Sequence, residues 1–250
     1  MHFTAETSSN GVVERHFTLG ESTGVLWSPA TANTGAPLLL CGHAGGMHKK
    51  APGLVAGARY SVGTAGYTVA ALDAPGHGDR PRSERDLHCG EAIHRARAAG
   101  EPIAPIVTDY SRWVAERALP EYRAALDALL ALPEIGADAP VGYAGITLGV
   151  VTGLLLAAAD PRIAALSLGP VFVDDALLEL AGRVTVPVQY RIPWHDSDFD
   201  RASALELFDA LGSTEKTLHA HAGRYDQVPA TERASAAAFL AAHLGTGVPV

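Results

Sequence analysis

The strongest constraint on the fold is one strand–turn–helix segment, VGYAGITLGVVTGLLLAAADP, over residues 141–161. An apolar strand enters the turn GITLG at 145–149, and an apolar helix follows until Asp160 and Pro161 end it. The two glycines allow strand and helix to approach closely, while the tight turn pushes the central side chain out over the sheet edge. The segment predicts a nucleophile elbow, with Thr147 where serine usually stands.

Strands and helices alternate along most of the chain. This alternation predicts an α/β fold with a mostly parallel, eight-stranded sheet, helices on both faces, and ligands at the carboxyl ends of the strands. The 250 residues, 48% of them hydrophobic, suit a single domain over 1–250. The expected strands are 12–20, 22–30, 36–43, 67–73, 139–146, 163–170, 186–194 and 215–222. Besides the elbow helix, the expected helices are 52–65, 104–132, 174–182, 201–212 and 229–243.

A long polar excursion between Pro75 and about Pro120 interrupts this alternation. Such a long excursion in a compact domain predicts a lid or cap over the site, at about 82–118. Its apolar residues either line the ligand pocket or form a core stripe. We expect them to line the pocket, and they are Ile103, Ile106, Tyr110 and Trp113.

The charge balance excludes some partners. Nineteen basic against 27 acidic side chains give a net charge of -8, which opposes binding to nucleic acid. The two cysteines form neither a disulfide framework nor a metal cluster, so we expect no metal and no cofactor. The beginning of the chain lacks the pattern of a signal peptide, and the most apolar run, 150–159, is too short for a membrane span. We therefore expect a soluble, cytoplasmic protein without a membrane partner, its oligomeric state open.

Four motifs, LLLCGHAGGMHKK, YTVAALDAPGHGDRP, YAGITLG and FDALGSTEKTLHAHAG, together resemble small α/β-hydrolases of the dienelactone-hydrolase or esterase kind. The resemblance covers nearly the whole chain and implies a triad in the order nucleophile, acid, histidine. It places Thr147, Asp196 and Tyr225 at these positions. Tyrosine, with a reference pKa near ~10, is a proton donor at neutral pH and cannot replace a histidine base.

The same resemblance implies an oxyanion hole. Its backbone donors would be near Ala44 or Gly45 and at Leu148. The adjacent His43 either belongs to the pocket or braces the loop by hydrogen bonding. His221 and His195 are histidines that could stand in for the missing base if their loops bend toward the pocket.

The two altered triad positions predict negligible hydrolysis. The site then resembles that of atypical family members, the bottromycin-type peptide aspartate epimerases. This resemblance implies an isomerase that converts L-Asp to D-Asp in a small hydrophobic modified ribosomal peptide, by substrate-assisted exchange of the Cα proton. In that chemistry His43, Thr147 and Tyr225 would position the substrate. The alternatives are a residual esterase or lactonase that uses Thr147, and a noncatalytic peptide-binding pseudohydrolase.

Overall fold

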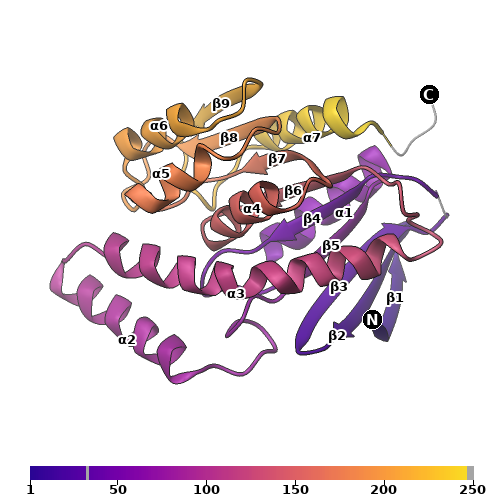
Figure 1. Cartoon of the computed structure of the whole chain (residues 1–250), viewed down its shortest axis with the longest axis horizontal. Helices are drawn as coiled ribbons and strands as arrows, with labels where there is room; N and C mark the ends of the chain where they lie inside the picture. Colours follow the sequence, from indigo (N-terminus) through magenta and orange to yellow (C-terminus); the bar gives the residue numbers. More distant parts are fainter. Residues whose placement is uncertain (32–33, 247–250) are drawn as a thin grey trace.

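The computed structural model describes residues 1–31 and 34–246, and its centre is one mixed nine-stranded sheet (Figure 1). The strand order is β1-β2-β3-β5-β4-β6-β7-β8-β9; the pairs from β1 to β5 are antiparallel and those from β5 to β9 are parallel. The strands are β1 (His2–Ser9), β2 (Val12–Leu19), β3 (Ser22–Pro29), β4 (Leu38–Gly42), β5 (Thr68–Leu72), β6 (Val141–Gly145), β7 (Ile163–Leu168), β8 (Val188–Pro193) and β9 (Lys216–His221). The helices are α1 (Pro52–Ala65), α2 (Glu84–Ala99), α3 (Ala104–Leu130), α4 (Leu148–Ala159), α5 (Asp175–Ala181), α6 (Arg201–Ala210) and α7 (Ala230–Leu244).

Helices cover both faces of the sheet, as the alternating pattern predicts. In Figure 1, α3, α4, α5 and α6 lie on the near face, while α1 and α7 lie behind the sheet. The larger core cluster fills the space under α3 to α6, and a smaller one lies beneath α1 and α7. None of the helices in the described ranges is long and apolar enough to span a bilayer.

The structure corrects the expected strand number from eight to nine. The missed strand is β1, which pairs antiparallel with β2 at the edge of the sheet. Its residues are nearly all exposed, with only Phe3 partly buried. An edge strand without a buried face has no alternating apolar pattern, so the sequence gives no signal for it.

The polar excursion contains two helices. Helix α2 begins with a capping box, in which the Ser83 side chain and the Asp86 carboxylate satisfy each other's backbone N–H groups. Helix α3 starts beside it and continues through Pro120 as far as Leu130, deep into the larger core. Figure 1 shows α2 and the first turns of α3 projecting from the sheet, and their role as a lid stays a prediction.

Glycines permit the close approach of β4, β6 and α4 at the elbow. A Cβ atom on Gly149 would lie 2.5 Å from the carbonyl oxygen of Gly42, and one on Gly145 would lie 2.6 Å from that of Gly149. The Tyr143 hydroxyl closes the contact by donating to the Gly149 carbonyl at 2.8 Å. Since both clashes are with backbone, no side-chain movement can relieve them.

We predict that Gly149→Ala destabilises the protein by about 1–3 kcal/mol, because the added methyl group overpacks two backbones. The matched control is Gly63→Ala in α1, where a Cβ atom would meet nothing within 4 Å. The stability of that variant should increase by about 0.5–1 kcal/mol, because alanine lowers the conformational entropy of the unfolded chain. Urea unfolding of both measures the difference; equal changes in the two variants would contradict the tight approach at Gly149.

Candidate active site

Thr147 occupies a strained turn at the carboxyl end of β6. Its backbone angles are φ 49° and ψ -111°, a region that a β-branched residue rarely adopts. Such a conformation costs about 1–3 kcal/mol and persists only where the surroundings enforce it. Two backbone bonds do so: Thr147 N–H donates to the Pro170 carbonyl at 2.8 Å, and Gly149 N–H donates to the His43 carbonyl at 3.1 Å.

The turn directs the Thr147 hydroxyl toward backbone donors. Gly45 N–H donates to Thr147 Oγ1 at 3.2 Å. Leu148 is the first residue of α4, so its N–H has no acceptor within its own helix. This N–H lies at the amino-terminal end of α4, where the helix dipole is positive. Gly45 and Leu148 are two of the expected oxyanion donors; Gly45 contacts Thr147 through its N–H, and Leu148 follows Thr147 in the chain.

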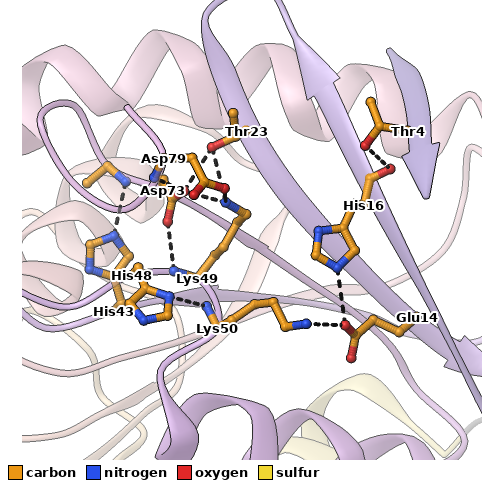
Figure 2. Close-up of polar contacts among 11 residues, drawn as sticks. Thr4, Glu14, His16, Thr23, His43, His48, Lys49, Lys50, Asp73 and Asp79 are labelled. Carbon is orange, nitrogen blue, oxygen red and sulfur yellow. Dashed lines mark hydrogen bonds and ion pairs between the residues drawn. The ribbon is translucent and has the colours of Figure 1, made fainter. Parts of the chain in front are cut away.

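His43 braces the loop that carries Gly45. Its Nε2 accepts a hydrogen bond from Ala74 N–H at 3.0 Å, and Figure 2 shows this bond as a dashed line to the His43 ring. Its Nδ1 lies 2.8 Å from the Ala44 carbonyl. Burial lowers the pKa of His43 to about 4, which keeps the ring neutral near pH 7. Because both ring nitrogens are engaged, the geometry supports the bracing role rather than proton transfer.

A buried ion pair fixes the far end of the same loop. The ammonium of Lys49 contacts the carboxylate of Asp73 and lies 2.6 Å from that of Asp79, as Figure 2 shows. Lys49 N–H also donates to Asp73 at 2.8 Å, and Thr23 Oγ1 donates at 2.9 Å. Burial raises the pKa of Asp73, but these hydrogen bonds outweigh it and hold the pKa below its usual value. The loop after β4 is thus tied to the end of β5.

Asp196 and Tyr225, at the acid and histidine positions of the triad, contact each other through a backbone N–H and not through the Tyr225 side chain. Tyr225 N–H donates to Asp196 Oδ2 at 2.9 Å, and Asp198 N–H donates to Oδ1 at 2.9 Å. The Tyr225 ring packs edge-on against Phe199 at 5.7 Å between centroids. Within residues 1–31 and 34–246, no hydrogen bond joins Thr147 to Asp196 or Tyr225. Their shared catalytic role stays a prediction.

The two alternative histidines differ in environment. His195 is exposed on the loop after β8. His221 is buried at the end of β9, and neither ring nitrogen has a hydrogen-bond partner among the described residues. Burial, followed by the charge of Arg191, lowers its pKa. A buried, unpartnered imidazole is costly, which makes His221 the stronger candidate for a functional group.

The expected pocket residues of the excursion lie apart from the main cavity. The Tyr110 hydroxyl donates to Asp86 at 2.7 Å, and the Trp113 ring packs between the guanidiniums of Arg85 and Arg117. Ile103 and Ile106 belong to the start of α3. These four residues, Ile103, Ile106, Tyr110 and Trp113, do not line the cavity described below, so their contact with a ligand stays a prediction.

The principal cavity has a volume of about 470 Å³ and lies between α1, α7 and the sheet. It reaches the elbow at Gly145 and Ile146 and the oxyanion loop at Ala44. Its size is ordinary for a small-molecule site. No local sequence pattern indicates this cavity, because α1 and α7 are about 165 residues apart and only the folded sheet brings them together. The described residues contain no group of three or more His, Cys, Asp or Glu side chains able to hold a metal ion.

The fold matches solved structures over nearly its whole length. A cold-adapted esterase from an Arctic intertidal metagenomic library is 30% identical, with a TM-score of 0.76 and coverage of 98% of this chain and 100% of that one. Acetyl xylan esterase 1 from Thermoanaerobacterium is 12% identical, with a TM-score of 0.65 and coverage of 95% and 87%. A dienelactone hydrolase from Anabaena variabilis is 18% identical, with a TM-score of 0.64 and coverage of 92% and 99%. No protein-family model and no curated protein matches the chain.

These neighbours correct the expected activity. The isomerase with negligible hydrolysis, inferred from Thr147 and Tyr225, is wrong, because the matching structures are esterases and a hydrolase. Nothing in the comparisons supports a likeness to peptide epimerases or a triad that has lost hydrolysis. The physical reason for the error is that the altered residues at two triad positions, Thr147 and Tyr225, leave the strained turn and its Gly45 donor intact.

We predict that Lys49→Met destabilises the protein by about 3–5 kcal/mol, because it leaves the fully buried Asp73 charge unpaired. The matched control, Lys50→Met, should cost less than about 1 kcal/mol, since Lys50 is 39% exposed and Glu14 keeps the Trp27 donor.

Denaturant unfolding at several pH values measures both variants. A carboxylate with a lowered pKa stabilises the fold above its unfolded value, near 3.8, and loses this effect as the pH falls through the folded pKa. The loss of stability caused by Lys49→Met should therefore shrink as the pH falls and disappear below the lowered Asp73 pKa. A deficit independent of pH would show that the lysine stem, rather than the ion pair, supports the loop.

Proposed function

Because the chain belongs to the α/β-hydrolase superfamily, we propose that it hydrolyses esters of carboxylic acids with Thr147 as the nucleophile. The observation that carries the proposal is the strained turn, in which Thr147 keeps a φ of 49° beside the Gly45 donor. Strain of this kind collects at functional sites, because selection for stability alone would remove it. The esterases among the structural neighbours support the same reaction class.

In the proposed reaction, Thr147 Oγ attacks the ester carbonyl carbon and loses its proton. The negative charge that develops on the carbonyl oxygen is stabilised by the N–H groups of Gly45 and Leu148. Collapse of this intermediate breaks the bond to the alcohol, which leaves with a proton and forms an acyl-threonine ester. Water then hydrolyses this ester by the same two steps and releases the acid.

We propose His221 as the base that takes and returns the proton. Its lowered pKa keeps the imidazole neutral at pH 7, so one nitrogen is free to accept a proton. The ring has no competing hydrogen bond within the described residues, unlike that of His43. The His221 carbonyl also accepts from Trp194 N–H at 2.7 Å, which ties the end of β9 to the acid loop.

Asp196 and Tyr225 have a supporting role in this proposal. The carboxylate of Asp196 is occupied by the backbone N–H groups of Tyr225 and Asp198, so it joins the two loops beside the site. Tyr225 lines the cavity. In this proposal Asp196 holds the loops in place, and Tyr225 helps to hold the acyl group and to exclude water.

We predict that Thr147→Gly abolishes ester hydrolysis, with a loss of at least about 10⁴-fold, while it raises stability by about 1 kcal/mol. Glycine adopts a positive φ without strain, so stability and activity should change in opposite directions. Thr147→Ser, which keeps the hydroxyl and removes the methyl group, should retain or increase activity.

Hydrolysis of nitrophenyl esters and labelling by a fluorophosphonate, followed by mass spectrometry at residue 147, measure the effect. Turnover that survives in Thr147→Gly would overturn the assignment of the nucleophile.

We predict that His221→Gln lowers kcat by about 10²–10⁴-fold, whereas the control His195→Gln changes it little. The pKa of His221 lies below its ordinary value of 6.5, and only the neutral ring accepts a proton. Wild-type activity should therefore be full at pH 7 and fall as the pH decreases through that lowered pKa. If the same fall of activity at low pH were found in His221→Gln, another group would be the base.

A further inference from the structure

The cavity between α1 and α7 connects the elbow with a pair of arginines. At one end it is bounded by Ala44, Gly145 and Ile146, beside Thr147. Arg191 of β8 and Arg233 of α7 also line it. A molecule in this cavity therefore contacts Gly145 and Ile146, which precede Thr147 in the elbow, as well as two guanidinium groups.

The walls between these two ends are mainly apolar. Residues of β4, α1 and α7 form them, chiefly Leu39, Cys41, Leu54, Ala58 and Leu240. Burial raises the pKa of the Cys41 thiol to about 12, so it stays protonated and acts as a small apolar side chain. Such walls bind a hydrocarbon chain and exclude water from charged groups nearby.

Arg191 is a cation without a partner. Its Nε is buried and makes no hydrogen bond, and no ion pair of its guanidinium is found within residues 1–31 and 34–246. Burial lowers its pKa, and the charge of Glu232 partly offsets this effect. An unpaired, partly desolvated guanidinium destabilises the folded protein. Such a group indicates an anion-binding site, because a bound anion would neutralise its charge.

Two carboxylates, Glu232 and Asp226, lie near these arginines, but neither forms an ion pair with Arg191 or Arg233 among the described residues. Arg233 is close enough to lower the pKa of Arg191 further, and its Nη1 donates to the Val228 carbonyl at 2.7 Å. Glu232 is engaged by His219 at 3.2 Å. Asp226 also lines the cavity, but it is exposed and lies 3.6 Å from Arg224. In the described structure, neither arginine has a carboxylate of its own.

We infer that this cavity binds the acid part of the substrate, and that this acid part is an apolar chain ending in a carboxylate held by Arg191 and Arg233. The substrate class is thus monoesters of dicarboxylic acids, an assignment that rests on the proposed ester hydrolysis at Thr147. The apolar walls hold the chain, and the two guanidiniums neutralise the free carboxylate. Guanidinium groups match carboxylate geometry and form charge-assisted bonds in a water-poor site.

Direct binding tests the cavity without reference to catalysis. Calorimetry with octanoate and with octan-1-ol compares an anionic and a neutral chain of equal length. Octanoate should bind about 10–100-fold more tightly than octan-1-ol, and Arg191→Met or Arg233→Met should remove this advantage. Arg224→Met, which changes an exposed arginine outside the cavity, should keep it. Arg191→Met should also have an unchanged or higher Tm, because it removes an unpaired cation.

Hydrolysis then tests the substrate class. The wild type should favour monomethyl adipate over methyl hexanoate in kcat/KM by about 10–100-fold, and Arg191→Met should lose this preference mainly through KM. Equal binding of octanoate and octan-1-ol, or an anion preference unchanged in both arginine variants, would overturn the inference. If octanoate binds as expected but no ester is hydrolysed, the anion site stands and the proposed function fails.

Discussion

The left-handed turn at Thr147 is the constraint on which the site depends. Strand β6, the loop after β4 and the start of α4 can meet only because Gly145 and Gly149 have no side chains there. The backbone bond from Gly149 to His43 then ties the turn to the oxyanion loop. Since a β-branched residue at positive φ is unfavourable, the packing of these three segments supplies the energy that keeps it. The hydroxyl and its donors are therefore held before any substrate arrives.

Two groups of charged side chains near the site differ in how they are paired. Lys49 is fully paired with Asp73 and Asp79, and the result is a rigid support for the oxyanion loop. Arg191, whose Nε is buried, and the exposed Arg233 line a mainly apolar cavity, and neither forms an ion pair in the described structure. A neutralised buried charge serves the fold, whereas an unneutralised one costs free energy until a ligand compensates it.

Several parts of the site could be predicted from the sequence, because they depend on local patterns. The strained elbow at Thr147 follows from a motif at a strand end, whereas the oxyanion role of Gly45 and Leu148 and the triad roles of Asp196 and Tyr225 stay predictions. The role of His43 could not be decided, since its partner Ala74 comes from the next strand. The isomerase expectation failed because identities at two triad positions were given more weight than the retained geometry.

The sequence by itself determined the alternation of elements and the elbow, because apolar periodicity and glycine spacing act over a few residues. It did not reveal β1, whose edge position leaves no buried face. Only the tertiary structure decided the place of the cavity, since α1 and α7 become neighbours through the sheet order. The isolation of Arg191 and His221 was likewise decided by folding, because a missing partner is a property of three-dimensional surroundings and leaves no trace in residue order.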